Sequence, residues 1–157
     1  MSFEQSITIR IADAEDIPRV IDLERRCDTA AHWSEKQYRD LFHAQPPTVP
    51  IALIAEGEGA HALLGFLIAR YIAQEWELEN IVVAPDVRGW GIGRRLMQEF
   101  LSRAKQTGSQ SVFLEVRESN IPARRLYESL RFNEIGRRKG YYANPVEDAV
   151  LYSKTLP

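Results

Sequence analysis

Hydrophobic and polar positions alternate or recur along the chain in runs that predict a succession of strands and helices. Isoleucines alternate with polar residues over residues 6–12 (SITIRIA), which predicts a half-buried strand. Asp13 follows as a predicted N-cap, and apolar residues with helical spacing then predict a helix to about Cys27. In HWSEKQYRDLF, the capping-box spacing of Ser34 and Gln37 predicts the start of a second helix.

The middle of the chain contains three apolar segments followed by an amphipathic one. Residues 49–56, 61–73 and 75–84 predict three strands, with a turn at EGEG between the first two. From Ile92 onward, apolar positions recur with a helical period, which predicts a helix with one buried face. Gly108 is the predicted C-terminal stop of this helix.

The last third of the chain predicts a strand, a helix and a hairpin. Residues 111–119 predict the strand, 123–132 the helix and 141–156 most of the hairpin. The basic run GRRKG (136–140) is most simply a solvated turn or strand end. No repeat, linker or low-complexity tract interrupts this order, so we expect one α/β (α+β) domain over residues 1–157.

Composition narrows the class of protein. A chain of 157 residues that is 45% hydrophobic and 27% charged is typical of a globular domain with a real core. The formal net charge of −2 argues against a purely electrostatic nucleic-acid binder. Cys27 is the only cysteine and the three histidines are scattered, so we expect no disulfide and no metal site. With no membrane-length apolar run and no signal peptide, we expect a cytoplasmic protein.

A glycine-rich stretch, VRGWGIGRR, separates the strand at 75–84 from the helix that begins near Ile92. Because a helix N-terminus has unpaired backbone N–H groups, Gly89, Gly91 and Gly93 predict a site where a phosphate or pyrophosphate approaches the backbone. No Lys-Ser/Thr follows Gly93, which excludes a P-loop. The glycine spacing also disfavours a dinucleotide fingerprint.

Two residues downstream have side chains suited to moving protons. Strand alternation places Glu115 beside hydrophobic residues, where a carboxylate is unfavourable unless it is paired, hydrated or functional. An ion pair with Arg117 or a neighbouring strand is the plain alternative. Tyr127 lies on the inward face of its predicted helix, where a core tyrosine with a satisfied hydroxyl is the commoner case for this residue type. Acyl transfer to an amine needs a base and an acid, and this pair fits both roles.

The segment 88–93 (RGWGIG) fits the pattern (Arg/Gln)-x-x-Gly-x-(Gly/Ala) and resembles the acetyl-CoA motif of the GNAT N-acetyltransferase superfamily. LEVRESNIPARRLYESLRF, followed by YY and EDA, resembles the RimI-type branch, bacterial enzymes that acetylate the N-terminal alanine of a small-subunit ribosomal protein. The resemblance implies a mixed, mostly antiparallel twisted sheet of about seven strands with about four helices. It also implies acetyl-CoA as donor, no metal, and a protein N-terminus as acceptor.

Carried over by motif, the resemblance implies Glu115 as general base and Tyr127 as general acid. It implies cofactor contacts at Ile81, Val82, Val83, Arg88, Gly89, Trp90, Gly91, Ile92, Gly93, Arg94 and Asn120. Within that set, we expect Trp90 to be a surface residue rather than a recognition residue, and Asn120 to act as N-cap or ligand contact. The implied acceptor contacts are Trp33, which is also predicted to pack on the helix it precedes, and the hairpin residues Tyr141 and Tyr142.

Two departures from the family pattern have different consequences. Arg131 replaces a glycine, which costs stability if that position is left-handed. No proline precedes Trp33, which leaves the acceptor open. Glu75, Glu77 and Glu79 alternate on one strand face, which is either solvated or attractive to a basic peptide. A small-molecule amine as acceptor and a catalytically silent acetyl-CoA-binding module therefore remain alternatives. We expect a monomer or a weak dimer.

Overall fold

A seven-stranded mixed sheet forms the centre of the protein. The computed structural model describes residues 6–27, 32–46, 49–58 and 63–157, so the turn at EGEG and the start of the strand predicted at 61–73 lie partly outside them. The sheet order is β1-β2-β3-β4-β5-β7-β6, and among its strands only the neighbours β4 and β5 run parallel. The strands are β1 (Thr8–Ile11), β2 (Ile51–Glu56), β3 (Leu63–Ile72), β4 (Glu75–Val83), β5 (Ser111–Arg117), β6 (Asn133–Tyr142) and β7 (Glu147–Thr155).

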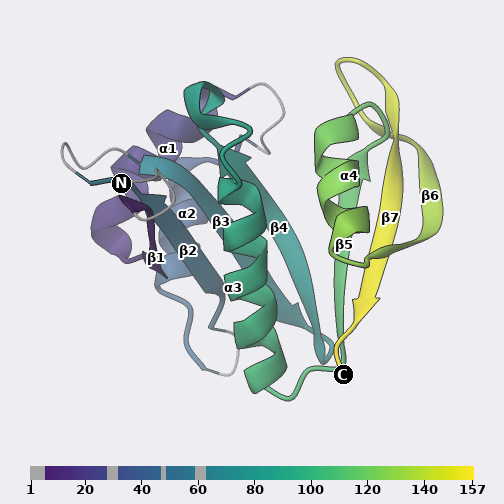
Figure 1. Cartoon of the computed structure of the whole chain (residues 1–157), viewed down its shortest axis with the longest axis horizontal. Coiled ribbons are helices and arrows are strands. Elements are labelled where there is room, and N and C mark those ends of the chain that lie inside the picture. The colour runs from purple at the N-terminus through teal and green to yellow at the C-terminus, as the bar shows by residue number, and fades with distance from the viewer. Residues whose placement is uncertain (1–5, 28–31, 47–48, 59–62) are drawn as a thin grey trace.

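Within the described ranges four α-helices cover the sheet (Figure 1), and the predicted element order is confirmed. They are α1 (Ile17–Arg25), α2 (Glu35–Phe42), α3 (Ile92–Gln106) and α4 (Ile121–Ser129), with short 3-10 turns η2 (Ala14–Asp16) and η3 (Pro85–Val87) before α1 and α3. Gly108 has φ +79° just past α3, as expected of a helix stop. Helix α4 starts at Ile121 because Asn120 caps it, which is one of the two roles expected of Asn120, and because Pro122 is tolerated in its first turn.

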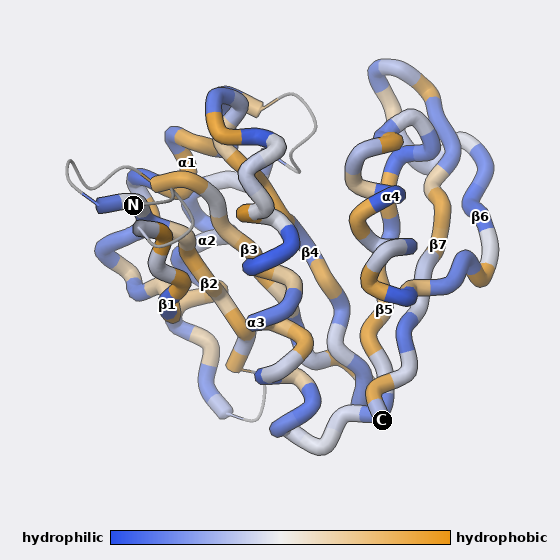
Figure 2. Tube along the Cα trace, viewed as in Figure 1, coloured by the Kyte–Doolittle hydropathy of each residue, from blue (hydrophilic) through white to orange (hydrophobic). Residues whose placement is uncertain are grey.

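The hydrophobic core lies on both faces of the central strands. Four consecutive residues of β2 (52–55) and five of β3 (65–69, GFLIA) include no exposed residue, which requires cover on both sides of the sheet. Helix α3 packs against β2, β3 and β4, while α1 contacts β3 and α2. Figure 2 shows hydrophobic residues concentrated on these central strands, whereas β6 at the edge is mostly hydrophilic.

The start of α2 forms as its sequence predicts. The Ser34 hydroxyl accepts a hydrogen bond from the Gln37 amide (3.1 Å), and the Gln37 side chain accepts one from the Ser34 amide (2.8 Å). Trp33 packs on Tyr38 with ring centroids 5.3 Å apart, which confirms the predicted staple. The Tyr38 hydroxyl accepts a hydrogen bond from the Asn80 side chain at 3.3 Å, which connects α2 to strand β4.

Strand β4 contains an irregularity that opens the sheet. Asn80 pairs with Ile68 and Leu78 with Ala69, so Glu79 is an extra residue in β4, a β-bulge. Pairing of β4 with β5 covers only residues 76–78 and stops at this bulge. Beyond it the two strands diverge (Figure 1), and α3 and α4 lie on either side of the opening. The divergence leaves one edge of residues 79–83 without a neighbouring strand, which is the space where the cavities described below lie.

The basic run at 136–140 corrects one prediction, because it lies inside β6 rather than in a turn or at a strand end. The Arg137 side chain forms ion pairs with Glu118 and Glu134, and Arg138 pairs with Glu115. Both arginines also face β7 across the ladder. Because Arg137 and Arg138 have carboxylate partners and their backbone pairs with β7, this part of the run stays extended, and the reversal occurs at residues 143–146 instead.

The left-handed conformation anticipated at Arg131 is present, with φ +67° just past α4. Among the described residues, no helix combines the length and apolar character that crossing a bilayer requires.

Candidate active site

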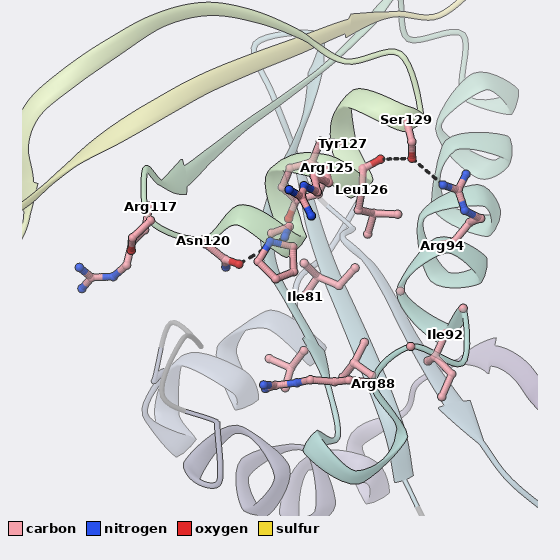
Figure 3. Close-up of a pocket in the computed structure, with 18 residues that line it drawn as sticks. Ile81, Arg88, Ile92, Arg94, Arg117, Asn120, Arg125, Leu126, Tyr127 and Ser129 are labelled. Atoms are coloured by element: carbon pink, nitrogen blue, oxygen red, sulfur yellow. Dashed lines mark hydrogen bonds between the residues drawn. The ribbon is translucent and has the colours of Figure 1, made fainter.

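A cavity of about 810 Å³ lies where β4 and β5 diverge, bounded by the start of α3 and by α4 (Figure 3). The described residues of its lining include four arginines, Arg88, Arg94, Arg117 and Arg125, and no aspartate or glutamate. A cavity with this charge is suited to a large anion. Its remaining lining residues are Ile81, Val82, Val83, Gly89, Gly91, Ile92, Gly93, Ser119, Asn120, Pro122, Ala123, Leu126, Tyr127 and Ser129.

The glycine loop provides backbone donors at one end of this cavity. Gly89 and Gly91 have φ of +86° and +81°, and a Cβ on either would have no atom within 4 Å. Gly91 is the N-cap of α3 and offers no side-chain cap, while the amide of Arg95 makes a helical bond to its carbonyl (3.1 Å). The amides of residues 92–94 therefore have no helical acceptor and carry the positive end of the helix dipole. These observations fit a bound phosphate or pyrophosphate.

Gly93 does not fit the expectation that all three glycines leave space for a phosphate. A Cβ at this position would lie 3.3 Å from Cδ2 of Leu126 and 3.6 Å from Cγ2 of Val83. Its small size therefore suits the close approach of α3 to α4 and β4, and the residue also lines the cavity.

One face of α4 also lines the cavity, and sequence reasoning missed it. Pro122, Arg125, Leu126 and Ser129 have the i, i+3, i+4, i+7 spacing of one helical stripe, which was the available signal. The Arg94 guanidinium donates to the Ser129 hydroxyl at 2.5 Å, so this stripe is tied to α3 across the cavity (Figure 3).

The free edge of β4 forms a second wall. Ile81 and Val83 are half-buried, whereas the Val82 side chain is in the core with 4% exposure. Val82 can therefore contribute only its backbone to a ligand. An unpaired strand edge beside an apolar wall suits an extended amide chain such as a pantetheine arm.

A second cavity of about 520 Å³ continues from the first toward the β6–β7 hairpin. Five residues line both cavities, namely Ile81, Arg117, Asn120, Ala123 and Tyr127. The others are His32, Leu78, Glu79, Asn80, Glu115, Val116, Tyr142, Ala143 and Asn144. Glu115 was predicted to belong to a site, whereas His32, Asn80 and the loop residues 143–144 were not. They come from separate segments with no shared motif, so nothing in the sequence pattern identified them.

Tyr127 lies where the two cavities meet. Its side chain is 4% exposed and packs against the rings of Phe132 and Tyr152, with centroids 5.9 and 6.2 Å away. Burial raises the pKa of Tyr127 above its ordinary value, with a smaller contribution from Tyr142. Within the described residues its hydroxyl has no hydrogen-bond partner. The open alternative of a core tyrosine therefore accounts for the packing of the ring but not for the position of the hydroxyl.

Glu115 lies on the cavity face of β5 with 14% side-chain exposure. Its Oε1 is 3.3 Å from Nη2 of Arg138, so the ion pair considered as an alternative is present, but with β6 rather than with Arg117. Glu79 is the nearest comparable carboxylate in the cavity lining, and burial raises its pKa. Glu77 behaves in the same way, with further contributions from Glu79 and Glu115.

The three predicted acceptor residues are placed differently. Tyr142 lines the second cavity, and its neighbour Tyr141 is 52% exposed with the Arg138 guanidinium over its ring at 5.5 Å. Trp33 is not part of the lining and instead lies under the Arg70 guanidinium at 5.1 Å, while the adjacent His32 reaches the cavity. Trp90, predicted as a cofactor contact and surface residue, is 39% exposed and lies outside the lining of the first cavity.

The remaining predicted cofactor residues, Asn120 and the segments 81–83, 88–89 and 91–94, all line the first cavity. Asn120 also caps α4 by accepting from the Ala123 amide at 3.3 Å, so the cap and the cavity position coexist. Within the described parts of the chain, no group of three or more His, Cys, Asp and Glu side chains is arranged to hold a metal ion.

Comparisons with known proteins agree with this geometry. The family model of the acetyltransferase (GNAT) family matches residues 17–132. The ribosomal protein bS18-alanine N-acetyltransferase of Salmonella typhimurium is 36% identical over 146 residues, covering 92% of this chain and 94% of that protein. These findings confirm the predicted resemblance to the RimI-type branch.

Solved structures agree with the fold. The crystal structure of the ribosomal-protein-S18-alanine N-acetyltransferase from Escherichia coli superposes with a TM-score of 0.82 and 30% identity, covering 96% of this chain and 94% of that one. Arabidopsis thaliana NAA60 in complex with acetyl-CoA has a TM-score of 0.86 at 18% identity, covering 96% and 99%, and supports the fold alone. The chain belongs to the acetyltransferase (GNAT) family, whose members transfer acetyl from acetyl-CoA to an amine.

Proposed function

We propose that this N-acetyltransferase acetylates the N-terminal α-amine of a protein, and that the acceptor is a ribosomal protein that begins with alanine. The observation that carries the proposal is the meeting of an arginine-lined cavity with a glutamate-containing one at a buried tyrosine, Tyr127. The names of relatives that match nearly the whole chain support the choice of acceptor.

Glu115 is the proposed general base. An ammonium has no lone pair, so the acceptor amine must lose a proton before it attacks the acetyl carbonyl. The Glu115 carboxylate faces the second cavity and takes that proton directly or through one water. Its Oε1 also lies 3.3 Å from Nη2 of Arg138, which holds the carboxylate in place on β5.

Tyr127 is the proposed general acid. Acetyl-CoA supplies an acetyl group activated as a thioester, and its departing sulfur is neutralised by a proton. Burial keeps the Tyr127 phenol protonated at neutral pH and above, so the hydroxyl holds a proton for that step. Its membership of both cavity linings supports this role.

The first cavity is the proposed cofactor site. The amides of residues 92–94 and the side chains of Arg88 and Arg94 bind the pyrophosphate. The edge of β4 at 81–83 binds the pantetheine arm, and Asn120 contacts the cofactor at the junction. At the acceptor end, Tyr142 contacts the peptide, with Tyr141 and Trp33 further from the cavity.

The experiment that tests the proposal compares acceptors in one assay. The protein is incubated with acetyl-CoA and a basic peptide starting with alanine, in parallel with a panel of polyamines, amino acids and aminoglycosides. We expect kcat/KM to be at least ~10²-fold higher for the peptide, because peptide contacts beyond the amine contribute binding energy in the transition state. Turnover of the small amines alone would contradict a protein acceptor, and no turnover of any amine would favour a silent acetyl-CoA-binding module.

The proposal extends to organisation and location. We infer one domain over residues 1–157, a monomer or weak dimer, a cytoplasmic location and no nucleic-acid partner. The near-neutral charge supports the last point, since the formal net charge is −2.

A further inference from the structure

Arg117 joins three sequence segments that the proposed roles of Glu115 and Tyr127 leave unexplained. Arg117 ends LEVR, Tyr142 ends the pair YY, and Glu147 opens EDA. The Arg117 guanidinium lies over the Tyr142 ring, 4.4 Å from its centroid. Its Nη1 is 3.2 Å from Oε2 of Glu147, which is 30 residues away in sequence. The three segments therefore meet around one cation.

The same guanidinium holds the loop that connects β6 to β7. Arg117 Nη2 donates to the carbonyl of Ala143 (3.2 Å), and Nη1 donates to the carbonyl of Pro145 (3.3 Å). On the other side, the Glu147 carboxylate accepts from the Ser119 amide at 2.5 Å, just past the end of β5. The loop is thus attached to the end of β5 at both of its flanks.

The ion pair of Arg117 with Glu147 is ionised and partly buried, which suits a fixed attachment of the β6–β7 loop. Hydrogen bonds from Ser119 and Arg117 hold the pKa of Glu147 below its ordinary value, so the carboxylate is ionised at neutral pH. The side chains of Arg117 and Glu147 are only 26% and 14% exposed. A planar guanidinium satisfies two carbonyls, a carboxylate and a ring together, which a lysine ammonium does not reproduce.

The position of Arg117 separates it from the other cavity arginines. In Figure 3 its guanidinium points away from Arg88 and Arg94, although the residue lines both cavities. Its donors are engaged with the hairpin loop, while Tyr142 and Ala143 line the second cavity. The contacts of Arg117 therefore determine where one wall of that cavity stands.

We propose that Arg117 is a positioning residue that holds Tyr142 and the loop 143–145 against the second cavity and thereby sets the affinity for the acceptor. The inference rests on the proposed function, because that function assigns the second cavity to the acceptor. Arg117 does not contact the reacting atoms. Its loss consequently affects acceptor binding more than it affects the chemical step or the binding of acetyl-CoA.

Steady-state kinetics of Arg117→Lys test this role. The acceptor is whichever amine the wild-type enzyme uses with the highest kcat/KM, so the test does not require a peptide. We expect KM for the acceptor to rise about tenfold, since hydrogen bonds to a charged group are lost, while kcat and KM for acetyl-CoA stay within ~3-fold. The matched control is Arg103→Lys, whose exposed ion pair with Glu99 on α3 is remote from both cavities. A rise in KM for acetyl-CoA equal to or above that for the acceptor would overturn the proposal.

A double-mutant cycle tests whether Arg117 acts through Tyr142. Tyr142→Leu removes the ring that the guanidinium contacts. If Arg117 acts by holding this ring, adding Arg117→Lys to Tyr142→Leu raises the acceptor KM by less than ~2-fold more. Fully additive effects on KM would refute the coupling.

Hydrogen exchange of the substrate-free protein separates this inference from the proposed function. We expect amides of residues 142–147 to exchange at least ~10-fold faster in Arg117→Lys than in wild type or Arg103→Lys, because the loop loses its attachment. Exchange that stays unchanged there overturns the positioning role. If the wild type acetylates no amine, the proposed function fails, and this exchange result alone decides the role of Arg117.

Discussion

The two ends of the cleft are built from different parts of the protein. The proposed cofactor end consists of backbone amides at the start of α3, the free edge of β4 and arginines, and none of the described residues that line it is acidic. The proposed acceptor end consists of side chains from β4, β5, α4, the β6–β7 loop and the segment before α2, and includes Glu79 and Glu115. One end is cationic and mainly local in sequence. The other is acidic and assembled from distant segments.

The cationic lining of one end and the acidic lining of the other keep two oppositely charged substrates apart except at their reacting atoms. Under the proposed function, a phosphate-bearing donor is attracted to the arginine end, and an amine, charged as it arrives, is attracted to the glutamate end. Burial raises the pKa values of Glu79 and Glu77, with additional repulsion from neighbouring carboxylates. A bound ammonium would relieve that repulsion. Tyr127, which belongs to both linings, lies at the boundary between the two charge environments.

Glu115→Gln should lower turnover strongly without changing the binding of acetyl-CoA. We expect kcat to fall by roughly 10³-fold, because the amide keeps the shape of the side chain but cannot accept the proton. Affinity for acetyl-CoA, measured by calorimetry, should change less than ~2-fold, since Glu115 is absent from the lining of the first cavity. The matched control is Glu99→Gln on the exposed face of α3, which should keep wild-type turnover. A kcat that survives Glu115→Gln would remove this residue as the base.

Tyr127→Phe tests the boundary between the two ends. We expect kcat to fall about 10²-fold with acetyl-CoA affinity within a few-fold, because only the proton of the hydroxyl is lost. Tyr152→Phe is the control, since that buried hydroxyl hydrogen-bonds Arg124 and Glu128 rather than facing a cavity. If affinity for acetyl-CoA fell as much as kcat, Tyr127 would be a binding residue.

The pKa of Tyr127 adds a pH criterion for the same residue. Burial disfavours the tyrosinate and raises the pKa, so the acid keeps its proton through its ordinary value of about 10. We therefore expect kcat of the wild type to show no alkaline decrease from Tyr127 below about pH 10. Loss of activity centred below that pH in the wild type, and its disappearance in Tyr127→Phe, would contradict a buried acid.

The contrast between the two ends also explains which features of the protein could be predicted from the sequence and which could not. The glycine loop and the helix start are contiguous, so Gly89, Gly91 and Arg94 could be assigned to the cofactor cavity from one short stretch. The order of strands and helices followed from periodicity for the same local reason. The β-bulge at Glu79 and the meeting of Arg117 with Glu147 depend on pairing between distant strands, which periodicity does not specify.

A comparison of Gly91→Ala with Gly108→Ala tests whether the glycine loop binds the cofactor. Both glycines have φ near +80°, and a Cβ on either would have no atom within 4 Å, so each substitution introduces the same backbone strain. We expect both to lower the free energy of unfolding by about 1 kcal/mol in denaturant titrations. Only Gly91→Ala should also raise KM for acetyl-CoA, by about tenfold, because its methyl group projects into the pyrophosphate site. Equal KM values in the two variants would mean that this loop does not hold the cofactor.

Arg131→Gly tests the same backbone conformation away from both cavities and should have the smallest effect. Arg131 has φ +67° and lines neither cavity, so its strain serves no ligand. Relief of that strain, offset in part by the greater freedom of glycine in the unfolded chain, should raise stability by up to about 1 kcal/mol and Tm by ~2–4 °C. Arg103→Gly, inside helix α3, is the control and should lower Tm by a similar amount, because glycine is unfavourable in a helix interior. Kinetic constants for both substrates should match the wild type in Arg131→Gly, and a changed KM for either would place this position in the active site.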